Sequence, residues 1–292
     1  MSPSPHTVGI IGLGSMGQPM AGHIIDAGHD VVVLHRSLHK AEGARAVDSP
    51  RHMARQCDVV ILLVPGAPEI DGVLDELVEG ARERDPDHDR LILTVSSTVS
   101  PVDITRWHRD TSGVEFVDAP ISGGEAGAVR GDLSVMVGGD DAAVGLVSDV
   151  LSSCGRPVHL GPLGSGQVAK ACNQLICAAE IVALSEASVV AERAGLDLAK
   201  LLDLLQGGYA GSVIMNDKTP KLVAHDYSVS AQAAFVHKDV SAYLDAARAT
   251  GTTSVLGGPI ASAAQQLIDA GLGEQDSVVF QKWVAERGTP RD

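Results

Sequence analysis

Aromatic and basic side chains are both scarce in this chain. Only 3% of its 292 residues are aromatic, too few for the stacking platforms on which proteins bind single-stranded nucleic acid. Lys and Arg number 22 against 37 Asp and Glu, and the resulting net charge of −15 repels nucleic acid and anionic lipid. We therefore expect no nucleic acid and no membrane among the partners.

Cysteines and long apolar runs are also few. Cys57, Cys154, Cys172 and Cys177 form no Cys-x-x-Cys pair, so we expect free, buried thiols and no metal site. No unbroken apolar run approaches the ~20 residues of a membrane-spanning helix, so we expect no such helix. Residues 1–6 lack the basic and apolar regions of a secretory signal, and we expect a cytoplasmic protein.

Apolar residues and glycine, by contrast, are plentiful, at 45% of the chain and 32 residues respectively. In the first half, short apolar runs alternate with stretches of helical periodicity, which is typical of βαβ units and a largely parallel sheet. Ligands bind such sheets at the carboxyl ends of the strands, so the residues after each run are candidate site residues. Strands are predicted at residues 8–11, 31–34, 59–64, 91–95, 114–117 and 133–137.

The pattern changes near residue 161. Residues 168–194 predict one long helix that is apolar on nearly every face and is therefore expected to be buried on all sides. We predict an α/β domain at 1–163 and, beginning with this interdomain helix, an all-α domain at 164–292. The further helices are predicted at 198–205, 236–250, 260–270 and 277–287.

A glycine-rich turn, Gly12-Leu13-Gly14-Ser15-Met16-Gly17, follows the first predicted strand. The first glycine permits a tight turn, the second lets a pyrophosphate approach the backbone, and the third lets helix and strand pack closely. The helix that follows presents free N–H groups to the phosphates. A strand before the turn, a helix after it and a surrounding βαβ unit together predict a Rossmann-like, dinucleotide-binding domain.

The end of the second predicted strand bears on the choice of dinucleotide. It reads His35-Arg36-Ser37, without the Asp or Glu that usually holds the ribose of NAD. An arginine there can bind the 2′-phosphate of NADP, helped by Ser37 and Lys40, so we expect NADP to be preferred over NAD. His35 and His39 could share a helix face as metal ligands, but without a third ligand we expect a solvated surface.

Two further segments carry polar groups suited to chemistry. Lys170 lies inside the predicted apolar helix, with Asn173 and Gln174 on the same face. Burial lowers the pKa of a lysine and suits it to proton transfer, whereas a lysine near a helix start can also extend to solvent. Ser122-Gly123-Gly124 follows the fifth predicted strand, and it either offers a hydroxyl and N–H groups to a carboxylate or is simply a flexible loop.

Taken in order, these segments resemble the β-hydroxyacid dehydrogenase family, which includes 3-hydroxyisobutyrate dehydrogenase and tartronate semialdehyde reductase. The resemblance covers nearly the whole chain and rests on four motifs: residues 12–17, 118–124, 166–173 and the pair Lys238-Asp239. It implies a Rossmann-like domain with a largely parallel sheet, a long interdomain helix and an all-α domain. It also implies a homodimer or homotetramer.

The resemblance implies roles for individual residues. Lys170 is expected to be catalytic, and the substrate is expected to contact Ser122, Gly123, Gly124 and Asn173. The cofactor residues expected from the turn, the strand ends and the family motifs are Gly12, Leu13, Gly14, Ser15, Met16, Gly17, His35, Arg36, Ser37, Val64, Pro65, Thr98, Lys238 and Asp239.

The expected function is NAD(P)-dependent interconversion of a small hydroxy acid and its semialdehyde by hydride transfer. Asn173-Gln174 and residues 207–212 favour the branch that reduces tartronate semialdehyde, with 3-hydroxyisobutyrate and L-threonate dehydrogenases as alternatives. An imine reductase usually replaces the lysine, so Lys170 argues against that chemistry. A non-catalytic NADP-binding regulatory module is the alternative outside the enzymes, and Lys170 together with Ser122 argues against it.

Overall fold

The computed structural model describes residues 5–85 and 90–288. The chain forms two compact units, residues 1–170 and 171–292. The division between them falls inside one long helix, α7 (Ser165–Arg193), a few residues after the change in composition near residue 161.

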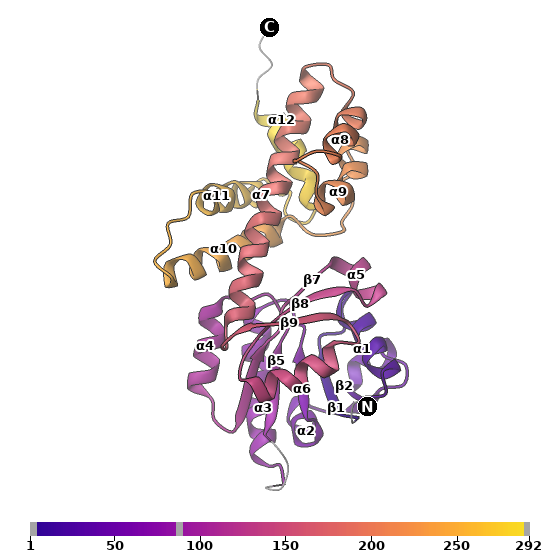
Figure 1. Ribbon diagram of the computed structural model, residues 1–292, viewed down its shortest axis with the longest axis vertical. Coiled ribbons are helices and arrows are strands. Elements are labelled where there is room, and N and C mark those ends of the chain that lie inside the picture. The colour runs from indigo at the N-terminus through magenta and orange to yellow at the C-terminus, as the bar shows by residue number, and fades with distance from the viewer. Residues whose placement is uncertain (1–4, 86–89, 289–292) are drawn as a thin grey trace. The chain divides into compact units, whose positions relative to one another are not determined.

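In its described residues, the first unit is built on a nine-stranded sheet in the order β3-β2-β1-β4-β5-β6-β8-β7, with β9 also paired to β8 (Figure 1). Neighbours from β3 to β6 are parallel, while β8 runs antiparallel to β6 and β7 and parallel to β9. The predicted, largely parallel sheet is therefore confirmed. The strands are β1 Thr7–Ile11, β2 Asp30–Leu34, β3 Arg45–Val47, β4 Val59–Leu62, β5 Leu91–Val95, β6 Val114–Asp118, β7 Ile121–Ser122, β8 Leu133–Gly138 and β9 Gly155–Gly161.

Both faces of this sheet are covered by helices, which explains why its strands read as unbroken apolar runs. Alternate side chains enter opposite cores: Val8 and Ile10 join one cluster, and Ile11 joins the other. Met20 of α1 packs in the first cluster and Trp107 of α4 in the second. The helices of this unit are α1 Gly17–Asp26, α2 Pro50–Gln56, α3 Ala67–Arg82, α4 Pro101–Asp110, α5 Gly124–Arg130 and α6 Asp141–Leu151, with the 3₁₀ helix η1 at His35–Lys40.

Three strands were not predicted. β3 has three residues and β7 has two, too few to show any periodicity. β9 is mostly exposed and contains Pro157, so it lacks the apolar run by which the other strands were found.

The second unit is helical throughout its described residues, as predicted. Its core joins Val240 of α10, Leu267 of α11 and Phe280 of α12 to Ala178 of α7. The sequence did not predict α9, because Pro220 lies inside this helix and proline usually ends one. The helices are α8 Leu198–Gln206, α9 Val213–Ala224, α10 Ala234–Ala249, α11 Gly257–Asp269 and α12 Phe280–Arg287, with the 3₁₀ turn η2 at Ser277–Val279.

The expectation that the long helix is buried on all sides is wrong for this chain. In α7, Ile176 is 60% exposed and Val190 is 68% exposed, because neighbouring helices of the chain cover only part of its circumference. By length and composition alone α7 could cross a membrane, and it is the one described helix that meets this criterion. The sequence of α7 contains no unbroken apolar run of this length, because polar residues such as Asn173 interrupt its apolar stretch.

The expectation that the cysteine thiols are buried is confirmed for two of the four cysteines. Cys57 and Cys154 are buried, and burial raises the pKa of Cys57 to about 12 and that of Cys154 to about 11. Cys177 is half-buried and Cys172 is exposed. The prediction is therefore wrong for Cys172, which lies on a face of α7 that this chain leaves uncovered.

Candidate active site

The carboxyl ends of β1, β2, β4, β5 and β6 lie along one edge of the sheet, because these strands are parallel neighbours. The glycine-rich turn follows β1 directly and His35 follows β2. Val64 comes two residues after β4, and Thr98 comes three residues after β5. The predicted cofactor residues of the first unit therefore gather at this edge.

The glycine-rich turn fits a bound dinucleotide. Gly12 has a φ of +108°, and a Cβ at this position would lie 2.4 Å from the carbonyl oxygen of Leu63. A Cβ at Gly17 would lie 2.0 Å from the carbonyl oxygen of Gly12. At Gly14, by contrast, no atom lies within 4 Å of the Cβ position, so the backbone is bare there. Close packing at the outer glycines and open space at the middle one are what a pyrophosphate cradle requires.

The 3₁₀ helix η1 lies beside this turn and supplies positive charge. Lys40 Nζ donates to the carbonyl oxygen of Leu13 at 3.1 Å. The Lys40 ammonium is therefore at the phosphate turn, whereas the sequence suggested it as a helper of Arg36. At the other end of η1, His35 Nε2 lies 3.3 Å from Asp48 Oδ1.

A hollow of about 440 Å³ opens where β2 and β3 end. Arg36 lines it and is exposed, and within residues 5–85 and 90–288 its guanidinium makes no hydrogen bond or ion pair. Asp48 and Glu76 face the same hollow. Ser37, the third predicted residue of this segment, is half-buried and does not line it. The full lining is Leu34, His35, Arg36, Asp48, Ser49, Pro50, Gly72, Val73 and Glu76.

The turns after β4 and β5 are joined by a buried hydroxyl. Ser97 Oγ donates to the carbonyl oxygen of Val64 at 2.7 Å. Pro65 and Thr98 are the residues that follow each partner, so this bond brings together the segments predicted to lie beside the nicotinamide. Ser97 was not predicted.

Ser122, Gly123 and Gly124 form the turn from β7 into α5. Gly123 has a φ of +137° and Gly124 a φ of +61°, values that other residues rarely adopt. Ser122 is half-buried and pairs with Ser134 of β8. The backbone conformation therefore requires both glycines, and the turn offers a hydroxyl together with backbone N–H groups.

Asp118, at the end of β6, anchors the start of α7. It is fully buried, with Oδ1 accepting from Gly164 N at 2.7 Å and Oδ2 from Gln167 N at 2.6 Å. Burial raises the pKa of Asp118 to about 6, although the backbone N–H groups act in the opposite direction. At Gly166 a Cβ would come within 2.2 Å of the carbonyl oxygen of Met136, so the helix start is packed tightly on the sheet.

Gln167 ties the same helix turn to the segment that carries Thr98. Its side chain is fully buried, with Nε2 donating to Ser97 O at 2.8 Å and Oε1 accepting from Val99 N at 3.2 Å. Lys170 follows one turn later and is only 7% exposed, so its side chain does not extend to solvent. Gln167 was missed, although a polar residue in an apolar helix suggests a buried hydrogen-bonding role.

The other predicted residues, Asn173, Lys238 and Asp239, belong to the second unit. There Asn173 Nδ2 donates to Gln174 Oε1 at 2.9 Å, and Gln174 Nε2 donates to Asp239. Lys238 Nζ lies 3.7 Å from Asp239 Oδ1 and 5.5 Å from the centre of the Phe235 ring. A small cavity of about 110 Å³ is lined by Gln174, Phe235 and Asp239, among others.

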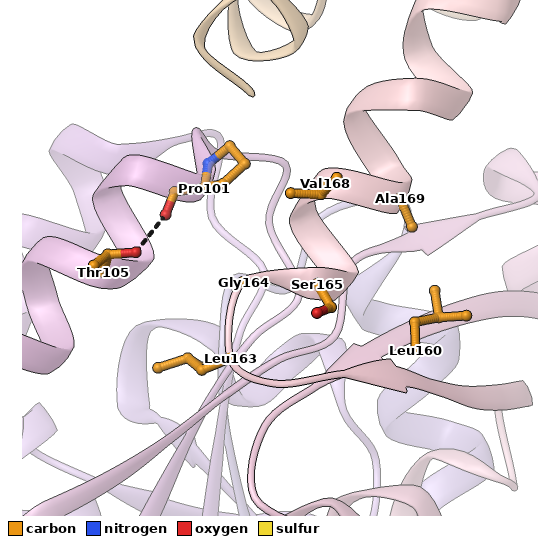
Figure 2. A pocket seen from close by; sticks show the side chains of 8 residues that line it. All are labelled: Pro101, Thr105, Leu160, Leu163, Gly164, Ser165, Val168 and Ala169. Carbon is orange, nitrogen blue, oxygen red and sulfur yellow. Dashed lines mark hydrogen bonds between the residues drawn. The ribbon is translucent and has the colours of Figure 1, made fainter. Parts of the chain in front are cut away.

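A larger hollow of about 510 Å³ lies between α4 and the first turns of α7 (Figure 2). Its lining includes Leu163 and Val168, and the hydroxyl of Thr105 donates to the carbonyl oxygen of Pro101 at 3.1 Å. None of the predicted site residues lines it. The predicted site residues of the first unit therefore lie outside this hollow.

An open phosphate cradle after β1 and a buried lysine at the same edge of the sheet define a dinucleotide-dependent oxidoreductase. Residues 7–164 match the family described as the NAD binding domain of 6-phosphogluconate dehydrogenase. Residues 164–283 match the family described as NAD-binding of NADP-dependent 3-hydroxyisobutyrate dehydrogenase.

Individual relatives agree with these matches. The chain is 36% identical over 262 residues to the probable 3-hydroxyisobutyrate dehydrogenase-like 3 of Arabidopsis thaliana, covering 85% of this chain and 79% of the relative. It is 34% identical over 249 residues to 2-hydroxy-3-oxopropionate reductase of Escherichia coli, covering 83% and 84%. A solved structure of Mycobacterium tuberculosis 3-hydroxyisobutyrate dehydrogenase with L-serine is 27% identical, with a TM-score of 0.83 over 98% of this chain and 100% of the other. The chain belongs to the β-hydroxyacid dehydrogenase family, whose members are NAD(P)-dependent oxidoreductases acting on CH–OH groups.

Proposed function

We propose that this NAD(P)-dependent hydroxyacid dehydrogenase reduces tartronate semialdehyde (2-hydroxy-3-oxopropionate) to the primary alcohol, with NADPH as the preferred reductant. The observation that carries the proposal is the burial of Lys170 on a helix turn that Asp118 and Gln167 fix at the carboxyl edge of the sheet. 3-Hydroxyisobutyrate is the second candidate substrate, because several relatives carry the name of its dehydrogenase.

In the proposed mechanism, Ser122 and the N–H groups of Gly123 and Gly124 bind the substrate carboxylate. Asn173 orients the carbonyl, and the Lys170 ammonium donates a proton to the carbonyl oxygen during reduction. In the reverse direction Lys170 accepts the proton of the hydroxyl. The nicotinamide supplies or accepts the hydride when it is bound. Val64, Pro65 and Thr98 are proposed to line its site, and Lys238 and Asp239 to contact the cofactor.

The choice of substrate within the family is supported by polar side chains next to Asn173. Gln174 bonds to both Asn173 and Asp239, so an amide and a carboxylate surround this position. Such a lining offers hydrogen-bond partners to the C2 hydroxyl of tartronate semialdehyde, which the methyl group of 3-hydroxyisobutyrate cannot use. We expect Gln174→Leu to lower kcat/KM for tartronate semialdehyde more than for 3-hydroxyisobutyrate.

The preference for NADPH is supported by Arg36, which is exposed and lines the hollow after β2. Arginine binds phosphate through paired, charge-assisted hydrogen bonds. We expect Arg36→Ala to raise KM for NADPH more than for NADH, and equal effects would contradict the assignment.

The first experiment is an initial-rate assay of the full chain with tartronate semialdehyde, using NADPH and NADH in parallel. Faster turnover than with 3-hydroxyisobutyrate, L-threonate or succinic semialdehyde supports the proposed substrate. Turnover of 3-hydroxyisobutyrate alone would replace it with the second candidate. Cofactor binding without turnover of any acid would favour a regulatory module.

Gly14→Ala provides a matched test of the phosphate cradle. A methyl group there meets no neighbouring atom, so the fold should tolerate it, but it would occupy the space of the pyrophosphate. We expect weaker binding of both dinucleotides at an unchanged melting temperature. Gly22→Ala, where a methyl group also meets nothing, is the control.

A homodimer or homotetramer is also proposed. Its support is the apolar surface that α7 leaves exposed, including Ile176 and Val190. Large apolar side chains that are exposed on a helix can pack against a second subunit. Light scattering coupled to size exclusion measures the mass directly, and a monomer would contradict the proposal.

A further inference from the structure

Charged side chains of both signs line the hollow at the ends of β2 and β3. Arg36 and His35 come from the residues after β2, Asp48 from the turn after β3, and Glu76 from α3. A site made only to receive a phosphate would be expected to hold cations and few carboxylates. The two carboxylates therefore call for an explanation.

The pairing of β2 with β3 places Asp48 in this hollow. Leu34 and Val47 are paired across the two strands, so the residues that follow them, His35 and Asp48, leave the sheet side by side. Their side chains meet with His35 Nε2 3.3 Å from Asp48 Oδ1. The sequence has no acidic residue at the end of β2. Asp48, which directly follows β3, places a carboxylate beside that position.

Asp48 remains available to a ligand. Its side chain is 80% exposed, and within residues 5–85 and 90–288 its second oxygen, Oδ2, accepts no hydrogen bond. His35 Nε2 lies beside Asp48 Oδ1, so the two side chains share one part of the hollow. Glu76 reaches the hollow from a different element, α3.

We propose that Asp48 is a specificity-determining residue of the cofactor site, which opposes the 2′-phosphate of NADP and favours the free ribose of NAD. This inference rests on the proposed binding of the adenosine end of the cofactor in this hollow. Arg36 and Asp48 then act in opposite directions, and the cofactor preference of the chain is the balance between them.

Electrostatic repulsion and hydrogen bonding both predict that Asp48 weakens binding of the 2′-phosphate and strengthens binding of the free ribose. A carboxylate repels a phosphate group that carries up to two negative charges, and it accepts hydrogen bonds from the two hydroxyls of an unmodified ribose. Removing the charge while keeping the shape, as in Asp48→Asn, removes the repulsion.

The test uses fragments of the cofactor, so that it reads binding rather than turnover. Calorimetry of the full chain measures the dissociation constants of adenosine 2′,5′-bisphosphate and adenosine 5′-monophosphate, which differ only in the 2′-phosphate. We expect Asp48→Asn to tighten the bisphosphate by about threefold to tenfold, the range for one screened charge near a phosphate. Binding of the monophosphate should stay unchanged or weaken.

Two control variants separate a local effect from net charge. Glu76→Gln removes the other carboxylate of the hollow, and its effect should be smaller because Glu76 comes from α3 and not from the strand end beside Arg36. Asp26→Asn removes an exposed carboxylate at the end of α1 and should change neither dissociation constant.

The outcomes distinguish this inference from the proposed function. If the wild-type chain binds the bisphosphate and Asp48→Asn changes its affinity no more than Asp26→Asn does, the role of Asp48 is overturned while the cofactor site stands. If the wild-type chain binds neither nucleotide, both the adenosine site and the role of Asp48 are overturned. In the enzyme assay, the expected result is a higher ratio of kcat/KM for NADPH to that for NADH in Asp48→Asn.

Discussion

Asp118 and Asp276 are fully buried carboxylates, one in each compact unit. Each accepts hydrogen bonds from backbone N–H groups at or just before the start of a helix that carries predicted site residues. Asp118 accepts N–H groups from the start of α7, which carries Lys170. Asp276 accepts from Ser230 N at 2.8 Å and Ala231 N at 3.1 Å, just before α10, which carries Lys238.

The two anchors differ in their charged surroundings. Within the part of the chain that the structure describes, the donors to Asp118 are backbone N–H groups, and burial raises its pKa to about 6. Burial acts on Asp276 in the same direction, but bonds from Ser230 and Val278 and the ammonium of Lys218, 3.8 Å away, leave its pKa below the ordinary value. Asp118 has backbone donors alone and a raised pKa, whereas Asp276 adds a hydroxyl and a cation to its backbone donors and has a lowered pKa.

The largest expected effect tests whether Lys170, on the helix that Asp118 anchors, takes part in catalysis. Lys170→Ala should lower kcat by about 10²–10⁴, because a general acid is lost at the proton-transfer step. Binding of NADPH, measured by fluorescence titration, should be nearly unchanged. A variant with near-normal kcat would remove Lys170 from the catalytic role.

The next effect concerns the Asp276 anchor. Asp276→Asn leaves the buried Lys218 without one of its two carboxylates, Asp217 being the other, and should lower the free energy of unfolding by about 3 kcal/mol. Urea denaturation measures the change. The double variant with Lys218→Met should recover part of the loss.

Asp118→Asn strands no cation and should cost less, about 1–3 kcal/mol for N–H groups left poorly paired. Equal losses in the free energy of unfolding for the two asparagine variants would contradict this comparison, since Lys218 would then make no measurable difference between the two carboxylates.

The pH dependence of stability should have opposite signs at the two anchors. Because the pKa of Asp118 is raised from 3.8 to about 6, the folded state binds its proton more tightly, and this contribution is full below pH 3.8 and lost by about pH 6. The loss is about 3 kcal/mol. The pKa of Asp276 is lowered, so its contribution is present above the ordinary pKa and disappears in acid.

Unfolding of the wild type and of Asp276→Asn below pH 4 measures the contribution of Asp276, and unfolding of the wild type and of Asp118→Asn between pH 4 and pH 7 measures that of Asp118. The difference between wild type and Asp118→Asn should decrease as pH rises through this window. A difference that increases with pH would mean that the backbone N–H groups outweigh burial at Asp118.

The smallest effect concerns Gln167, which connects the first anchor to the turn of Thr98. Gln167→Met should lower kcat about tenfold at a temperature where the protein is folded, because Lys170 and Thr98 lose their common support. Thr105→Val removes a hydrogen bond outside the site and is the control. If Gln167→Met lowers only the melting temperature, its role is purely structural.

Much of the fold could be predicted from the sequence because the parallel strands are buried on both faces. Runs such as Val59 to Leu62 are then continuous and visible. β9 could not be predicted, since it is exposed and has no such run.

Site residues that depend on backbone shape, such as Gly12 and Gly17, could be found in the same way, because only glycine fits there. Residues that act through a partner distant in the sequence could not. Asp48 meets His35 only through the register of β2 and β3, and Gln167 meets Ser97 across 70 residues.

The four cysteines differ in burial, and this difference makes one of them a selective site for labelling. Thiolates are the species that alkylating reagents attack, and the raised pKa values of Cys57 and Cys154 keep both thiols protonated at neutral pH. Cys172 is exposed and stands two residues after Lys170 on α7. A maleimide fluorophore should therefore attach to Cys172 before Cys57 or Cys154 wherever no second subunit covers this face of α7.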